Sequence, residues 1–299
     1  MRAMNDAQTV LITGTTTGIG RHAALHLARA GHHVIATGRN AAALAALRVE
    51  AEGLRLDVVT LDVTDRASLE HAAAEVVRLT DGRGVDALVN NAGYGEMAPM
   101  LEVREADVRA MYETNVFGLL AVTQAFLPAM VARGSGRIVN ISSVGGRVTL
   151  PLFGAYNSTK YAVESLSDAM RMELQPLGIR VVVIEPGGIK TEFANTSVRK
   201  VDTYRRADSP YAPVYAGIDE VKAQSERLAA DPLVISRVIE RAVTARSPRA
   251  RYMAPFYGRV IVALAAWLPT RTFDWLMARA MGVTRARLTL SGRHGAPTG

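Results

Sequence analysis

Apolar, β-branched runs alternate with segments of helical periodicity along the first two thirds of the chain. The strand-like runs cover 9–14, 33–38, 56–62, 86–93, 136–143 and 179–187. Helical spacing predicts helices at 21–31, 41–50 and 66–79, and longer ones near 102–132 and 155–177. Because strand and helix alternate this often, we predict an α/β fold, a doubly wound parallel sheet covered by helices on both faces.

The pattern changes after Thr191. Residues 192–217 carry two prolines and only weak periodicity, which predicts a long loop or lid over a substrate site, within about 190–230. Residues 214–246 have helical spacing, 251–255 suit a short last strand, and 256–281 form an apolar hairpin of helices broken at Pro269. We therefore expect a domain over 1–254, a helical, Arg-rich extension over 255–299, and a loose tail in the last dozen residues.

Composition narrows the class of protein. Of the 299 residues 49% are hydrophobic and 21% charged, which supports a sizeable core and argues against disorder. Cysteine is absent, so disulfides and thiolate metal sites are excluded. No run reaches the roughly 18 apolar residues of a membrane-spanning helix, and no apolar run precedes the first strand as in a secretory signal. We expect a cytoplasmic protein.

The formal charge of +7 is concentrated near the C-terminus. From Arg241 onward there are ten arginines and one acid, Asp274, a net of +9, which leaves −2 for the rest. Such a segment suits a membrane surface, an anionic ligand, nucleic acid, or simply solvent. No aromatic stacking platform accompanies it, so nucleic-acid binding is not expected. With the apolar hairpin it predicts peripheral membrane contact through 255–290; the alternative is a core-covering or subunit-contact hairpin.

The segment "TGTTTGIG" at 13–20 follows a strand and opens a helix. Gly14 permits a tight turn, Gly18 lets the backbone approach a pyrophosphate, and Gly20 allows close helix–strand packing. The spacing is not the commonest one, but the flanking strand and helix favour nucleotide binding over an ordinary turn. The second strand ends with Gly38, where NAD binders place an acid, and Arg39 beside it. This favours NADP(H) over NAD(H); the alternative is a solvated arginine.

Tyr156 and Lys160 are four residues apart in a predicted helix and are therefore neighbours on its surface. They form either an ordinary exposed pair or a phenol whose acidity is tuned. Half-ionising a phenol at pH 7 takes about 4 kcal/mol. An ammonium about 5 Å away offers roughly 3.3 kcal/mol if its own desolvation is small. The same spacing relates His22 and His26, but no third ligand accompanies them and no metal site is expected.

Seven motifs occur in an order that resembles the short-chain dehydrogenases/reductases: "TGTTTGIG", "LDVTD", "NNAG", "ETNVFG", "NISSVGG", "YNSTK" and "EPGGIKT". They span 13–191, about two thirds of the chain. The resemblance implies a single Rossmann-type domain that moves a hydride between NADP(H) and a carbonyl or hydroxyl group. "NNAGYG", "IEPGGIKTEF" and the C-terminal extension also look like the steroid- and retinol-dehydrogenase-like members.

The resemblance also implies the catalytic residues. Tyr156 would be the general acid in reduction and the base in oxidation, and Lys160 would hold the nicotinamide ribose and lower the tyrosine pKa. Ser143 would hold the substrate oxygen. Asn115 would order a water chain to the lysine; without the motif, a capping or buried structural asparagine would be the preferred interpretation.

Further positions would bind the cofactor. Asp62 and Val63 would meet the adenine. Thr17 stands where many NADP-dependent members carry a basic residue, so the NADP(H) preference depends on Arg39. The other implied positions are Gly14, Thr16, Gly18, Ile19 and Gly20 in the phosphate loop, Asn90, Ala92 and Gly93 along the cleft, and Pro186, Gly187, Ile189 and Thr191 at the nicotinamide.

The apolar extension favours a bulky apolar ketone, aldehyde or alcohol as substrate. A 3-oxoacyl-thioester reductase is the alternative within the family, disfavoured by the long extension. An NADP-binding regulatory or membrane-docking module without turnover is the alternative of another class, although Ser143, Tyr156 and Lys160 are all present. By resemblance we expect a homodimer or homotetramer formed through the helices at 102–132 and 155–177.

Overall fold

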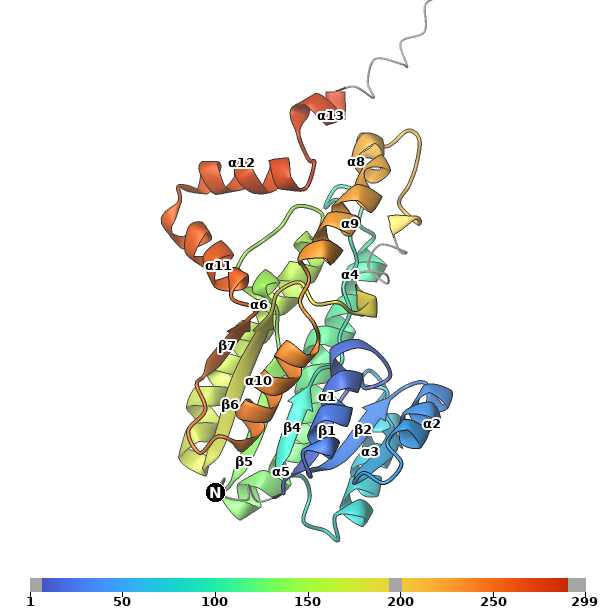
Figure 1. Ribbon diagram of the computed structural model, residues 1–299, viewed down its shortest axis with the longest axis vertical. Coiled ribbons are helices and arrows are strands. Elements are labelled where there is room, and N and C mark those ends of the chain that lie inside the picture. Colours follow the sequence, from blue (N-terminus) through green and yellow to red (C-terminus); the bar gives the residue numbers. More distant parts are fainter. Residues whose placement is uncertain (1–6, 194–200, 290–299) are drawn as a thin grey trace, which may run out of the picture.

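A computed structural model describes residues 7–193 and 201–289. Within them lies a seven-stranded sheet in the order β3-β2-β1-β4-β5-β6-β7, with every neighbouring pair parallel (Figure 1). The doubly wound α/β prediction is confirmed. The strands are β1 Thr9–Ile12, β2 His33–Gly38, β3 Leu56–Thr60, β4 Ala87–Asn90, β5 Gly136–Ile141, β6 Ile179–Pro186 and β7 Arg251–Ala254.

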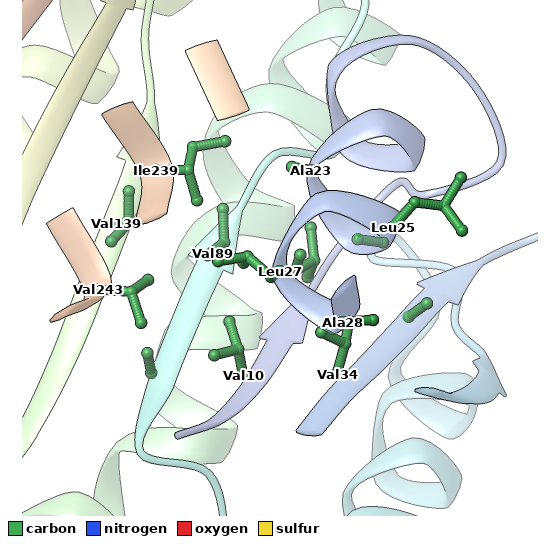
Figure 2. Packing of buried hydrophobic residues seen from close by; sticks show 14 of the residues in the cluster. Val10, Ala23, Leu25, Leu27, Ala28, Val34, Val89, Val139, Ile239 and Val243 are labelled. Atoms are coloured by element: carbon green, nitrogen blue, oxygen red, sulfur yellow. The ribbon is translucent and has the colours of Figure 1, made fainter. Parts of the chain in front are cut away.

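Helices cover both faces of the sheet, which explains why the strands are apolar at consecutive positions. In β1, Val10 and Ile12 face one core and Leu11 the other. Figure 2 shows the first core, where side chains of α1 and α10 point at those of β1, β2, β4 and β5. The flanking helices are α1 Gly18–Arg29, α2 Ala41–Glu50 and α10 Leu233–Thr244 on that face, and α3 Arg66–Leu79, α5 Leu119–Arg133 and α6 Gly154–Leu174 on the other.

The strand order reverses at the β1–β4 pair, and this positions the site. After β3 the chain returns across the sheet to lay β4 beside β1, with Val10 opposite Ala87. A crevice opens outside the carboxyl ends of the strands at such a switch point, and α/β proteins bind ligands there. The loops that follow β1, β4, β5 and β6 all meet at this edge.

The long helix predicted near 102–132 is not a simple α-helix. α4 Glu105–Tyr112 continues into a π-helical turn, η1 Glu113–Gly118, before α5 begins. By length and composition alone the stretch Glu105–Arg133 is also able to cross a membrane, which differs from the sequence expectation. Here its apolar side, with Val122, Phe126 and Met130, packs against the sheet.

The C-terminal part contains more breaks than its periodicity predicts. The segment 214–246, expected to be helical, contains three helices: α8 Ala212–Ala216, α9 Ile218–Leu228 and α10. Gly217 separates the first two, and Ala230 forms a bridge to Ile189 before Pro232 opens α10. The apolar hairpin is confirmed as α11 Tyr257–Trp267 and α12 Thr270–Ala280, with Pro269 between them.

Two expectations fall partly outside the described residues: 194–200 of the lid and 290–299 of the tail. The tail begins as a helix, α13 Arg285–Thr289, that lies against α8. Two short 3-10 turns complete the fold, η2 Val144–Gly146 and η3 Gln175–Leu177.

Two glycines with the same backbone conformation allow a stability prediction. Gly178 ends η3 at φ 78°, and a Cβ there would lie 2.0 Å from the Gly134 carbonyl oxygen. Gly53 has φ 80° but nothing within 4 Å. Gly53→Ala should lower the free energy of unfolding by about 1 kcal/mol, from left-handed strain alone, and Gly178→Ala by at least ~3 kcal/mol. Urea unfolding measures both; equal losses would contradict the packing at Gly178.

Candidate active site

The phosphate loop joins β1 to α1 and needs its glycines. Gly14 and Gly18 lie at φ 70° and 59°, a conformation that side-chain-bearing residues rarely adopt. A Cβ on Gly20 would lie 2.2 Å from the Gly14 carbonyl oxygen, so the helix can sit this close only with glycine there. Thr16 lies beside Gly38 at the end of β2, and Ile19 packs onto the first core.

The first turn of α1 is suited to an anion. No side chain caps it at Thr17 and it contains no acidic residue. By contrast, Asn40 and Asp65 cap α2 and α3 with their side chains. The N–H groups and the positive end of the α1 dipole are therefore available for a phosphate group.

Thr13 and Asn91, which sequence reasoning missed, fasten this loop to the end of β4. The Thr13 hydroxyl accepts from the N–H groups of Asn91 (3.0 Å) and Ala92 (2.9 Å). The Asn91 amide donates to the carbonyls of Thr13 (2.9 Å) and Gly14 (3.0 Å). The recurrence of small polar residues directly after two neighbouring strands was the available signal.

Arg39 and Asp62 face each other beyond the ends of β2 and β3. The exposed Arg39 guanidinium lies 3.9 Å from an Asp62 carboxylate oxygen, and Asp62 also accepts from the Thr64 hydroxyl at 2.7 Å. Val63 packs under η1, where a Cβ on Gly118 would come within 2.7 Å of it. The residues expected at the adenine end thus share one edge of the crevice.

Of the three residues expected along the cleft, the structure buries Asn90. Its amide donates to the Thr123 hydroxyl and to the Asn140 side chain, both at 2.9 Å, so it ties β4 to α5 and β5. Ala92 lies beside Gly14, whose added Cβ would come within 2.9 Å of it. A Cβ on Gly93 would lie 3.0 Å from Asn115 Oδ1 and 3.5 Å from Lys160 Nζ, so its backbone lies against both predicted catalytic groups.

Ser143, Tyr156 and Lys160 come together where β5 ends and α6 begins. Ser143 caps η2 by accepting from the Gly145 N–H at 3.0 Å, and its hydroxyl hydrogen-bonds the Tyr156 phenol. One turn along α6, Lys160 is buried; its Nζ donates to the Ile141 carbonyl at 3.0 Å and lies 5.8 Å from the centre of the Tyr156 ring.

Within this chain alone the pKa of Tyr156 is raised, whereas the family resemblance predicted that Lys160 would lower it. Burial raises it to about 12, although the hydrogen bond from Ser143 opposes the rise. Burial also lowers the pKa of Lys160 to about 8, against the attraction of Glu164. A lysine lowers the pKa of a neighbouring phenol toward neutrality only if its own desolvation is small, and Lys160 is enclosed.

Asn115 is buried, and the π-helical turn aims it into the site. Its amide accepts from the Tyr94 N–H (3.0 Å) and donates to the Tyr94 carbonyl (2.8 Å). It also donates to the Thr159 hydroxyl at 3.0 Å. Asn115 therefore ties the segment after Gly93 to α6. This structural role is compatible with its predicted role beside Lys160. π-Helical turns occur often at functional sites.

The residues after β6 form one wall of the crevice. Pro186 ends β6, the Gly187 N–H donates to the Ala254 carbonyl at 2.9 Å, and Ile189 pairs with Ala230. A Cβ added to Gly18 would lie 3.5 Å from the Thr191 side chain, so this wall reaches the phosphate loop.

Gly95 and Phe193 are further site residues that sequence reasoning did not single out. The Phe193 ring lies 5.3 Å from that of Tyr156, centre to centre. A Cβ on Gly95 would come within 2.7 Å of the Tyr156 ring and 2.8 Å of the Phe193 ring. The second glycine of "NNAGYG" was the signal: the chain must pass directly over the phenol there.

The histidine pair serves packing between helices. His22 Nδ1 lies 2.7 Å from the Ser236 hydroxyl and His26 Nε2 lies 2.8 Å from Glu240, so both rings join α1 to α10. Among the described residues no three His, Cys, Asp or Glu side chains gather as a metal site would require.

Comparison with known proteins identifies the family. The family described as short chain dehydrogenase matches residues 8–202. The uncharacterized oxidoreductase YbbO of Escherichia coli K12 is 34% identical over 90% of this chain and 94% of its own length. Retinol dehydrogenase 7 of Mus musculus is 33% identical over 90% of this chain and 87% of its own.

Solved structures of dehydrogenases have the same fold. A short-chain dehydrogenase from Streptomyces avermitilis has a TM-score of 0.70 at 30% identity and covers 97% of this chain and 99% of its own. A serine dehydrogenase complexed with NADP+ has a TM-score of 0.71 at 31% identity, covering 82% of this chain and 93% of its own. A short chain dehydrogenase/reductase from Burkholderia phymatum in complex with NAD shares the fold, with a TM-score of 0.76 at 23% identity over 88% of this chain and 94% of its own. The chain belongs to the short-chain dehydrogenase family and is an oxidoreductase acting on CH–OH or C=O groups, with a nicotinamide cofactor.

Proposed function

We propose that the protein moves a hydride between NADP(H) and the carbonyl or hydroxyl carbon of a bulky apolar substrate, with Tyr156 as general acid and base. The observation that supports this most is the meeting of Ser143, Tyr156 and Lys160 beside the phosphate loop, at the switch point of the sheet.

The residues present fit such a cofactor. The glycine turn and the uncapped start of α1 suit a pyrophosphate. The turn needs its glycines, because a Cβ on Gly14 would collide with Ala92 and one on Gly20 with the Gly14 carbonyl oxygen. Arg39 suits a 2′-phosphate, and Lys160 with Asn115 and Gly93 suits the nicotinamide ribose. When bound, the cofactor supplies or accepts the hydride.

The side chains of this chain would handle the proton. With a pKa of about 12, Tyr156 carries its proton at neutral pH and so donates it to a carbonyl oxygen during reduction. Ser143, already hydrogen-bonded to the phenol, is placed to hold the same oxygen. The Lys160 ammonium would favour the phenolate that forms as the proton leaves.

The apolar surroundings of the phenol support the proposed apolar substrate class. Tyr156 packs with Met111 and Ala155, and the rings of Phe153 and Phe193 lie 6.3 and 5.3 Å from its own. Such walls suit a ketone, aldehyde or secondary alcohol with a large hydrocarbon part. A 3-oxoacyl-thioester reductase, or a cofactor-binding module without turnover, is less favoured by these walls and by the complete catalytic set.

We also propose a homodimer or homotetramer. Phe117 on η1 and Tyr161 and Met172 on α6 are large, exposed side chains on the two long helices expected to pair. The localisation expected from the sequence, cytoplasmic with peripheral contact at a membrane surface, stays a prediction.

Tyr156→Phe removes only the phenolic oxygen. We expect kcat/KM for reduction of an apolar ketone to fall by about 10³-fold or more, with NADPH affinity retained. Steady-state NADPH consumption and a fluorescence titration of the cofactor measure the two quantities. Tyr252→Phe on β7, whose hydroxyl accepts from the Arg249 N–H at 3.0 Å, is the control and should match wild type. A Tyr156→Phe enzyme with a near-normal rate would contradict the proposal.

Arg39→Ala tests the cofactor preference. Loss of a charge-assisted contact to the 2′-phosphate should lower kcat/KM for NADPH by about ten-fold or more and leave that for NADH unchanged. Arg48→Ala is the matched control, an exposed arginine that likewise faces an aspartate, Asp57, at 3.4 Å. An unchanged NADPH/NADH ratio in Arg39→Ala would mean that this arginine does not select the cofactor.

The lowered pKa of Lys160 sets a pH dependence. Its ammonium persists below about pH 8 and is lost above it, so kcat/KM for NADPH should fall as pH rises through that value. Glu164 raises this pKa, so Glu164→Gln should move the fall to lower pH. Glu173→Gln, exposed on the same helix, should leave it in place. If Glu164→Gln leaves the pH profile of kcat/KM unchanged, Lys160 is not the titrating group.

A further inference from the structure

The outer face of α11 is apolar and exposed. Phe256, Val260, Leu264 and Trp267 are 72, 45, 43 and 87% exposed. Their spacing of four, four and three residues places them on one side of the helix. We call these four residues, together with Trp275 of α12, the outer stripe.

The outer stripe is not needed to hold the hairpin in place. The adjacent side of α11, with Ile261, Ala265 and Leu268, packs against the cluster of Phe273 of α12 with Val144 and Val148, just after Ser143. In Figure 1 the hairpin lies at the end of the molecule beyond β7 and α6, far from α2 and α3. α11 is therefore apolar on two sides, and residues 7–193 and 201–289 cover only one of them.

Both tryptophans of the chain, with arginines beside them, lie on the hairpin. The chain has two tryptophans, and both are here and exposed, Trp275 by 61%. Arg271 and Arg279 lie one turn before and after Trp275 and are also exposed. The Arg279 guanidinium lies 5.9 Å from the Trp275 ring, and Arg259 lies 5.9 Å from the ring of Phe256.

We propose that the outer stripe docks on the surface of an anionic lipid bilayer. Tryptophan settles at the boundary between headgroups and hydrocarbon, and arginines beside it meet anionic headgroups. A second copy of the chain is a poorer occupant, because symmetric pairing would set these arginines against each other and Asp274 is the one acid from Arg241 onward. This inference goes beyond the proposed function and holds whether or not the enzyme turns over.

Docking would bring the membrane beside the loop that carries Ser143. The covered side of α11 packs on Val144 and Val148, so this one helix separates the outer stripe from the loop that carries Ser143. An apolar substrate dissolved in the bilayer would then reach the enzyme over a short path.

The test uses the full-length protein and its own tryptophans. Vesicles of equal parts phosphatidylcholine and phosphatidylserine should carry the protein in flotation and shift its tryptophan emission to shorter wavelength. Pure phosphatidylcholine should bind it more weakly. Because both tryptophans are on the hairpin, the emission reports on the hairpin alone.

Paired variants decide which surface binds. Val260→Ser/Leu264→Ser keeps both tryptophans and should lower the vesicle partition coefficient by about ten-fold or more. Arg271→Glu/Arg279→Glu should lower it by at least about five-fold per arginine, on anionic vesicles only. The controls are Val49→Ser/Leu228→Ser and Arg66→Glu, which are also exposed but lie elsewhere. Circular dichroism checks that every variant is folded.

Four results would overturn the proposal. The first is the absence of flotation and of an emission shift in wild type, and the second is an equal loss of vesicle partitioning in the control variants. The third is an emission shift that grows with protein concentration without vesicles. The fourth is an equal emission shift with duplex DNA at the same phosphate concentration. The third would assign the face to self-association and the fourth to nucleic acid.

Discussion

Lys160 carries its ammonium into the protein, where 6% of the residue is exposed. One carbonyl, that of Ile141 at the end of β5, accepts from it at 3.0 Å, and Glu164 one turn along α6 supplies negative charge. A buried cation is unfavourable unless partners are fixed around it. Arg251 of β7 fixes Glu164 at 3.1 Å and Asp168 at 2.6 Å, so the last strand of the sheet helps to hold the charge on the catalytic helix.

The same enclosure explains the behaviour of the tyrosine. Removing water from Tyr156 raises its pKa to about 12, and removing water from Lys160 lowers the lysine pKa to about 8. Both shifts favour the neutral forms, so the pair starts with a protonated phenol that suits carbonyl reduction. Close backbone approach makes this enclosure possible: Gly93 lies against Asn115 and Lys160, and Gly95 lies against the tyrosine ring.

Much of this was predictable because it depends on local patterns. Strand and helix periods located all seven strands of the sheet and the flanking helices, and the motif order located the residues that meet at the switch point. The π-helical turn at Asn115, the clamp of Thr13 and Asn91, and the direction of the pKa shifts were not predictable, because each depends on contacts between segments far apart in the chain. Asn90 is instructive: its motif placed it along the cleft, whereas packing turns its amide toward α5 and β5. The break between α9 and α10 likewise coincides with a contact between distant segments, the bridge of Ala230 to Ile189.

Transfer of a labelled hydride tests the central claim most directly. NADPH that carries deuterium at the transferable position would be mixed with a panel of bulky apolar ketones and aldehydes, and the products examined by mass spectrometry. The account predicts one deuterium on the new carbinol carbon for each NADPH consumed. Tight NADPH binding with no label on any product would contradict it and would favour a cofactor-binding module without turnover.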